Sequence, residues 1–590
     1  MSGTDETPTG PRVRVWPGRV ARVLSGVLVL ALTGGAVALA RTLPDASTGA
    51  TTTPDAVAVA PSAATLVCPG PLQLPDDSSA GGSEFDRVPV DPVERVSGFA
   101  AGSTGDAALT TLDGAARSVD LGSGSAALAS PTAPVVLRAD PVDDQPARVA
   151  GATSSLVTDG DLRGLSTAAC ARPSSDVWLV GGSTVLESTA DLVIVNAGAT
   201  AADVTVELWG PNGAVDLGAG GTLLVAPGAE RVVVLAAVAA EQRRVVVHVQ
   251  AAGGQISAYL QDSALDGFTP QGTDLVTAGA APAQRQVVPG VVLTATDVDS
   301  ADAGALRLLV PGDTDATASV TLVGPDGAQP LTGAQDLRLV AGEVTDISLG
   351  GLPAGGYTAV VDSSAPVVAS AMTARAGRAG ELDEVARVDR AWSAATPTGA
   401  GLVAVPSGAT GSLVLAAVAD PDAEPDATAA TADGTTGAAD GTTPTAGATS
   451  TPTTGATDPP ASDGAGADAA TGDAATDGSP TPTTDPTGSA AAASTLRVTL
   501  RPYGSAGALD EVEVEVPAGS SLTVPVADLG TGVTGVEVVP DDLDGVTLSW
   551  ALLATAVAPD GPLLSVVAPL VDQAGTTEAL VQQGRRVGLG

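Results

Sequence analysis

Apart from its carboxylates, this chain carries few residues that could do chemistry. It has one histidine, His248, and no lysine. A Ser-His-Asp triad could therefore use only His248, and neither an S-x-x-K centre nor a phosphate-binding loop with its lysine can form. The repeat described below aligns His248 with Val360, so we interpret it as a packing residue. We expect no catalytic residue, no cofactor and no enzymatic activity.

The carboxylates are the remaining candidates, with 67 acidic residues against 26 arginines and a formal net charge of −41. Two carboxylates could form a glycoside hydrolase couple, but so many acids make chance pairs certain. One His and two Cys are too few for a His/Cys zinc site, and the negative charge argues against a nucleic-acid partner. Asp-rich turns could bind Ca²⁺ through oxygen, but we favour solvated turns and expect no metal. These turns hold Asp297, Asp299, Asp302, Asp313 and Asp315.

Two tryptophans differ in the face that strand alternation gives them. Trp550 shares its face with Val546 and Leu548, which predicts burial. Trp209 instead groups with polar neighbours, so we expect an exposed ring that could stack on a sugar. Trp209 is thus the candidate ligand contact.

The N-terminus carries an uncharged apolar run over 23–40, preceded by four arginines. Eighteen helical residues rise about 27 Å, just enough to cross the hydrocarbon core, and the preceding arginines orient the chain with its N-terminus inside. We predict a single-pass membrane anchor. The alternative is a secretory signal cleaved after Ala40. Both place residues 42–590 outside the cytoplasm, either held at the cell membrane or secreted.

Cys68 and Cys170 are the only cysteines, and both lie on the exported side of this segment. Disulfides form and persist outside the cytoplasm, so we predict that the two are paired. The alternative is two unrelated buried thiols.

Three segments of the chain resemble one another, at 191–260, 305–372 and 411–552. Each contains alternating strands and Gly-containing turns such as GPNG and GPDG, whose residues tolerate a positive φ. Short strands at close spacing, without helical periodicity, predict antiparallel sandwiches. The fold class is therefore all-β, with tandem antiparallel Ig-like β-sandwich domains, an N-terminal transmembrane helix and a disordered insert.

The insert is the tract 421–494, which has no Val, Leu, Ile, Met or aromatic residue. Because it can bury no apolar surface, we expect it to lack regular structure. Its Thr-Pro clusters could accept O-glycans or simply form an acidic spacer. The expected divisions are a cytoplasmic N-terminus (1–22), the anchor or signal segment (23–40), a tether (41–65), a β region with both cysteines (66–178), and sandwiches at 179–285, 286–395 and 396–580.

Two short motifs carry a resemblance to a known family, LVCPGP at 66–71 and a segment from Cys170 that ends in DVWLVGG at 176–182. On these motifs the sequence resembles an uncharacterised family of large exported actinobacterial proteins, domain-of-unknown-function family 5719. The resemblance implies an exported, envelope-associated protein and carries no established activity.

These observations predict a non-enzymatic, extracytoplasmic scaffold or interaction protein of the cell envelope. Its partner would be an envelope protein or a cell-wall polymer, with the membrane contacted through 23–40. The first alternative is a binding module for cell-wall or capsular polysaccharide, and a weaker one is a carboxylate-dependent glycoside hydrolase.

Overall fold

The structure is a computed structural model of the 590-residue chain. It describes residues 55–58, 60–73, 85, 90–102, 104–112, 118–122, 124–143, 145–300, 302–379, 385–420, 494–572 and 578–581. Among these residues, no helix is long and apolar enough to cross a membrane. The predicted anchor at 23–40 lies outside the described residues, as do much of the tether and all of the tract 421–494 except its last residue.

By their contacts the residues form two compact units. One comprises 1–61 and 574–590, and in it β1 (Asp55–Ala58) pairs antiparallel with β38 (Glu578–Val581). The other, 62–573, holds the remaining strands, which form several antiparallel sheets with hardly any helix. The predicted all-β class is confirmed at this level.

Strand alternation builds the sheets of unit 62–573. In β12 (Ala202–Gly210), Val204, Val206 and Leu208 are buried, while the residues between them are exposed or half-buried. This period of two gives each strand one core face. Gly213 ends the following GPNG turn at φ +114°, a conformation that favours glycine.

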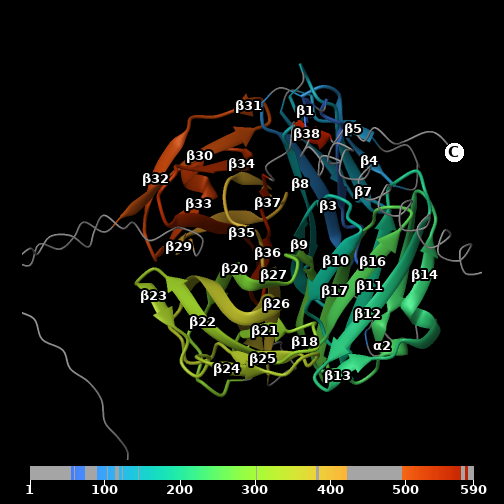
Figure 1. The fold of residues 1–590 in the computed structure, drawn as a ribbon, viewed down its shortest axis with the longest axis vertical. Helices are drawn as coiled ribbons and strands as arrows, with labels where there is room; N and C mark the ends of the chain where they lie inside the picture. Colours follow the sequence, from blue (N-terminus) through green and yellow to red (C-terminus); the bar gives the residue numbers. More distant parts are fainter. Residues whose placement is uncertain are drawn as a thin grey trace, which may run out of the picture. The chain divides into compact units, whose positions relative to one another are not determined.

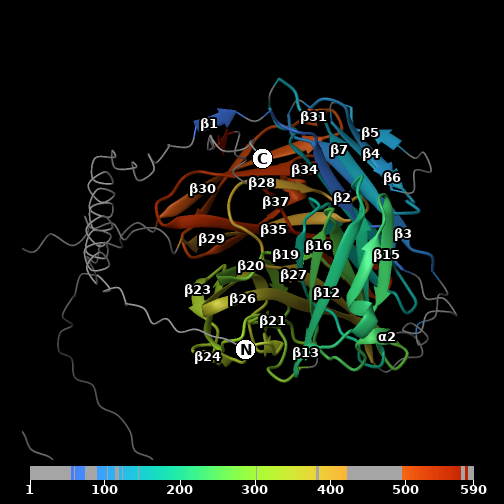
Figure 2. The same cartoon turned by 45° about the vertical axis from the view of Figure 1, so that its right-hand side comes forward.

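The strands of this unit group into four β-sandwiches of two sheets each (Figures 1 and 2). We number the sandwiches in chain order. The first covers 64–169, a region whose topology the sequence alone leaves open. Its sheets have the orders β6-β3-β8-β9 and β2-β7-β4-β5. Its strands are β2 (Ala64–Cys68), β3 (Val93–Ala100), β4 (Ala107–Thr111), β5 (Ser118–Asp120), β6 (Ser125–Ala129), β7 (Val135–Ala139), β8 (Val149–Val157) and β9 (Gly164–Ala169).

The second sandwich covers 176–279 and repeats this arrangement, with sheets β15-β11-β17-β18 and β13-β12-β16-β10-β19. The strand β14 also pairs with β12, and β12 and β16 lie side by side (Figure 2). Its further elements are β10 (Asp176–Val180), β11 (Ser188–Asn196), β13 (Gly213–Val215), η1 (Gly218–Gly221), β14 (Thr222–Val225), β15 (Ala229–Val234), α2 (Leu235–Val238), β16 (Val246–Ala252), β17 (Ser257–Asp266), β18 (Thr269–Val276) and β19 (Ala278–Gly279).

The third sandwich covers 283–394 and shares one long strand, β26 (Gly355–Ala379), between its two sheets. The first part of β26 pairs with β20 and β22, and its second part pairs with β21 and β27. The other strands are β20 (Ala283–Leu293), β21 (Ala305–Leu309), β22 (Ala316–Gly324), β23 (Gly327–Pro330), β24 (Leu337–Leu339), β25 (Thr345–Ser348) and β27 (Ala386–Ala394).

The fourth sandwich covers 401–571, with sheets β33-β29-β35-β36 and β31-β30-β34-β28-β37. Its β29 ends just before the tract 421–494, and β30 follows that tract. Its elements are β28 (Gly401–Ala404), β29 (Thr410–Ala419), β30 (Thr495–Gly504), β31 (Gly507–Ala508), β32 (Val512–Pro517), β33 (Ser521–Pro525), η2 (Val526–Leu529), β34 (Val533–Pro540), β35 (Val546–Ala558), β36 (Gly561–Val567) and β37 (Leu570–Val571).

One strand from each sandwich meets the others in the interior of this unit. We call β9, β18, β27 and β36 the hub strands; each ends a sheet of its own sandwich and contacts at least two other hub strands (Figure 1). Glycines permit the close approach. A Cβ at Gly164 would lie 2.5 Å from the Thr273 carbonyl oxygen, and one at Gly272 would lie 2.5 Å from the Arg390 nitrogen.

The sandwiches also pack on one another in sequence order, and the fourth packs on the first. An apolar cluster joins the first and second sandwiches through Val67 and Tyr259. Further clusters join the second to the third, the third to the fourth, and the fourth to the first, where Phe99 lies 5.4 Å from the ring of Tyr503. Each of the four sandwiches therefore packs on two others, and together they form one body.

Two side-chain predictions are confirmed. Cys68 and Cys170 form a disulfide, which joins β2 of one sheet to the residue that follows β9 of the other. Trp550 is 1% exposed, and its indole N–H donates to the Gly399 carbonyl.

We expect Gly272→Ala to destabilise unit 62–573 much more than Gly213→Ala. Both glycines have a positive φ, at +102° and +114°, so either alanine is strained by about 1 kcal/mol. Only at Gly272 would the methyl group also overlap the backbone of a neighbouring strand, which should raise the loss to about 3 kcal/mol or more. Chemical denaturation of the two variants measures the difference. Equal midpoints would show that the hub strands are not held at this distance.

Candidate functional site

The hub strands carry polar side chains into the interior of unit 62–573. Asp274 on β18 is 1% exposed. It accepts hydrogen bonds from the Ser565 hydroxyl on β36 and the Trp392 backbone N–H on β27, both at 2.8 Å. The backbone N–H of Thr167 on β9 donates to the Ser565 oxygen at 3.0 Å. One carboxylate and one hydroxyl therefore connect all four sandwiches.

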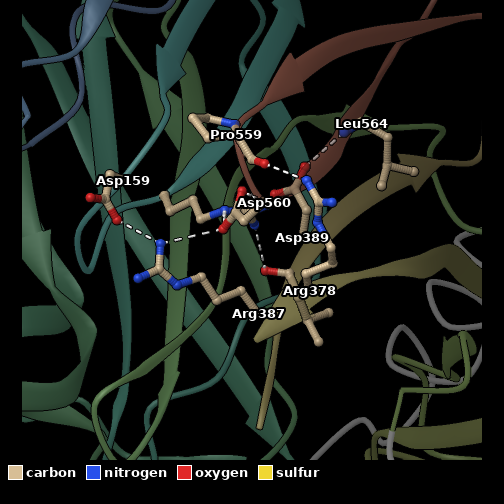
Figure 3. Close-up of polar contacts among 9 residues, drawn as sticks. Asp159, Arg378, Arg387, Asp389, Pro559, Asp560 and Leu564 are labelled. Carbon is tan, nitrogen blue, oxygen red and sulfur yellow. Dashed lines mark hydrogen bonds and ion pairs between the residues drawn. The ribbon is translucent and has the colours of Figure 1, made fainter. Parts of the chain in front are cut away.

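A cluster of arginines and aspartates continues this network at the ends of the hub strands (Figure 3). Arg163, whose side chain is fully buried, contacts both carboxylate oxygens of Asp560, at 2.7 and 2.9 Å. It also donates to the Val388 carbonyl at 3.3 Å. Arg387 contacts Asp159 at 2.6 Å and Asp560 at 3.3 Å. Residues from the first, third and fourth sandwiches are thus held together by charge-assisted bonds.

Burial shifts the titration of the hub carboxyls. Desolvation raises the pKa of Asp389 to about 8, although the Leu564 N–H and the Arg163 guanidinium favour its charged form. Burial also raises the pKa of Asp274 well above its usual range, and the nearby Asp389 raises it further. Asp389 therefore keeps a proton at neutral pH, because a buried charge without full compensation is costly. The hub is a buried hydrogen-bonded network with the Arg163–Asp560 ion pair at its end.

The histidine lies at the junction between the second and third sandwiches. Its two ring nitrogens contact Glu207 and Asp176, each at 3.0 Å. The ring stacks on Trp178 with centroids 3.9 Å apart, and His248 is 5% exposed. It is packed as its alignment with Val360 suggests, with one half-exposed carboxylate beside each ring nitrogen.

Trp209 is half-buried in the same junction. Its ring stacks on Trp178 with centroids 5.6 Å apart, and it packs in an apolar cluster with Val344 of the third sandwich. In each repeat, the residue directly before the Gly-containing turn packs on the next sandwich. At this position Val323 of the third sandwich packs on the fourth, and Tyr503 of the fourth packs on the first. Trp209 therefore has a junction role, and its contact with a ligand stays a prediction.

The Asp-rich loops lie apart from the hub. Asp315 accepts a bond from Arg338 at 2.6 Å, and Asp297 and Asp302 line a small surface pocket. Over the described ranges, no group of three His, Cys, Asp or Glu residues is arranged to hold a metal ion.

The sequence alone does not predict the hub, because the hub strands contain polar residues of the types that usually lie on the surface. The strand β18 reads TPQGTDLV and is nevertheless buried along its whole length. The one available signal was the recurrence of Ser, Thr and Asp inside the strands that close each repeat, such as LSTAA, QGTDLV and LLSVV.

Comparison with protein-family models matches residues 124–454 to the family of unknown function DUF5719. No curated protein matches the chain. Among solved structures, the crystal structure of Thermotoga maritima 1070 is similar at 15% identity with a TM-score of 0.15, covering 20% of this chain and 93% of that one.

We expect Asp389→Asn to change the pH dependence of stability. The folded carboxyl keeps its proton up to about pH 8, whereas in the unfolded chain it loses it near pH 4. Wild-type stability should therefore fall, relative to the variant, by at most about 1.4 kcal/mol per pH unit between pH 4 and 8. Denaturation at pH 5, 7 and 9 measures this difference.

Asp315→Asn is the matched control. The pKa of Asp315 is lowered by the Ala341 N–H and Arg338, so this carboxylate is charged in both states above pH 5. Its effect on stability should not vary between pH 5 and 9. If the stability difference between Asp389→Asn and wild type were also the same at every pH, a protonated Asp389 carboxyl in the folded state would be contradicted.

Proposed function

We propose that this chain, which belongs to the DUF5719 family of unknown function, serves as a non-enzymatic scaffold or interaction protein of the cell envelope, outside the cytoplasm. The supporting observation is the hub, in which Asp274 and Ser565 join all four sandwiches. Because hydrogen bonds in its interior hold the four sandwiches together, the unit presents its outer surfaces in fixed relative positions, as a scaffold requires. The buried carboxyls of Asp274 and Asp389 accept hydrogen bonds from residues on neighbouring hub strands.

The proposed location rests on two further features. The Cys68–Cys170 disulfide suits an oxidising compartment outside the cytoplasm. The apolar run at 23–40, with arginines before it, suits a single-pass anchor with an extracytoplasmic C-terminal part. Cleavage after Ala40, which would release a secreted protein, is the alternative. The Ig-like arrangement of the tandem sandwiches and a disordered insert at 421–494 belong to the same proposal.

The location is tested by fractionating cells of the source bacterium that express the full chain. We expect it to sediment with membranes, to resist extraction by alkaline carbonate, and to be digested when protease is added to intact spheroplasts. A cytoplasmic protein of known location is the control for spheroplast integrity. Recovery in the protected cytosolic fraction would contradict the proposal, and recovery in the medium would favour the secreted alternative.

A second candidate function is the binding of cell-wall or capsular polysaccharide. It is favoured by the part of Trp209 that remains accessible beside Trp178, since aromatic faces stack on sugar rings. Loss of one stacking platform should weaken binding by about tenfold, or roughly 1.4 kcal/mol.

This candidate is tested by co-sedimentation of the purified full chain with isolated cell walls. If it is correct, Trp209→Ala should weaken sedimentation by about tenfold. The control is Leu224→Ala, which removes a more exposed apolar side chain from the same sandwich. Equal binding by all three proteins would remove Trp209 as a ligand contact.

A further inference from the structure

A surface groove of about 1200 Å³ lies where the first sandwich meets the loops of the second. One wall is the end of β2 and the adjacent β7, including Thr65 and Arg138. The other wall is built from the β11–β12 loop and the β16–β17 turn, where the Thr200 hydroxyl donates to the Gly253 carbonyl at 2.9 Å. Small residues line most of it, which leaves room for a chain with side chains of its own.

The groove contains an open strand edge. In β2, the N–H and C=O of Val67 bond to Ala171 at 2.8 and 2.9 Å, on the side facing away from β7. Backbone groups alternate sides along a strand, so the N–H and C=O of Thr65, two residues before Val67, also point away from β7. Within the described residues they have no partner there, and Pro173, two residues beyond Ala171, cannot donate. Such an edge accepts a further strand.

The groove also differs in charge from the rest of the molecule. Its only charged lining residues are Arg138 and Arg172, in a chain with 67 acids and 26 arginines. Within the described part of the chain Arg172 has no carboxylate within 4.0 Å, although Asp572 is near enough to interact with its charge, and Arg138 has the exposed Asp140 at 3.8 Å. At physiological salt, charges farther than about 8 Å are largely screened, so a ligand in the groove meets a basic lining although the chain has a net charge of −41.

We propose that this groove binds an extended acidic segment of a partner protein, which adds to the open edge of β2 and places its carboxylates on Arg138 and Arg172. Backbone bonding to Thr65 selects a polypeptide over a polysaccharide, because only a polypeptide offers alternating N–H and C=O groups at strand spacing. This proposal rests on the proposed interaction role and specifies the chemistry of the partner.

The test uses the full chain and a fluorescent ten-residue probe of alternating Thr and Glu in fluorescence polarisation. We expect this probe to bind at least tenfold more tightly than the Thr-Gln peptide of equal length, and more weakly as salt rises. The probe methylated at alternate backbone nitrogens should lose binding, and polygalacturonate should compete poorly. Equal binding of the Thr-Gln or methylated peptide would overturn the proposal, as would equally tight binding of polygalacturonate.

Two variants test the two halves of the site. Arg138→Gln/Arg172→Gln should weaken the acidic probe at least tenfold and leave the Thr-Gln peptide unchanged. Thr65→Pro removes one edge donor while the β2–β7 bonds, made by Ala64 and Leu66, remain, and it should weaken both peptides.

Arg231→Gln, at an exposed strand position outside the groove, is the matched control and should bind like wild type. Thermal unfolding verifies that each variant folds. Unchanged binding by the folded Thr65→Pro or double arginine variant would overturn the proposal. These measurements use purified protein, so they can fail while the envelope location holds, and they can succeed if that location is wrong.

Discussion

The fold of unit 62–573 depends on satisfying the carboxyl of Asp274 in the interior. A buried polar group left without partners costs about 1 to 3 kcal/mol or more, and this group finds its partners on two other sandwiches, Trp392 and Ser565. No single sandwich could complete that bonding by itself. The relative placement of the sandwiches is therefore a condition for burying β18 at all, and the glycines at 164 and 272 supply the space that this placement needs.

The junctions repeat one geometry with different chemistry. The strand position that holds His248 in the second sandwich holds Val360 in the third and Glu537 in the fourth. Its partners change accordingly: His248 bonds to Glu207 and Asp176, whereas Glu537 pairs with Arg148 of the first sandwich. If a sandwich packed on a different neighbour, this position would face an unpaired charge or an unfilled cavity. The differences between junctions therefore favour the native order of the four sandwiches.

Local pattern was enough to predict the strands, the burial of Trp550 and the Cys68–Cys170 bond, because each depends on alternation or on the rarity of cysteine. It was insufficient for the first sandwich, whose strands are short and interrupted by turns. It was also insufficient for the hub. Asp389 stands in RVDRAW like any surface aspartate, and contacts with residues more than 100 positions away, such as Gly272 and Leu564, bury it. The period-two rule assumes that polar residues face water, and the hub strands break that assumption on both faces.

The exclusive use of arginine fits the way these contacts are made. Arg163 contacts both oxygens of Asp560 and donates to the Val388 carbonyl, and Arg307 bonds both oxygens of Asp346 and the Gly182 carbonyl of the preceding sandwich. A planar guanidinium can satisfy several acceptors from fixed directions, which an ammonium group cannot do as well. The arginines that join sandwiches therefore use their hydrogen-bond donors within the fold. Arg138 and Arg172 instead line one groove beside the edge of β2, and the acids near them, Asp140 and Asp572, are not part of its lining, so both guanidinium groups are open to a molecule outside the chain.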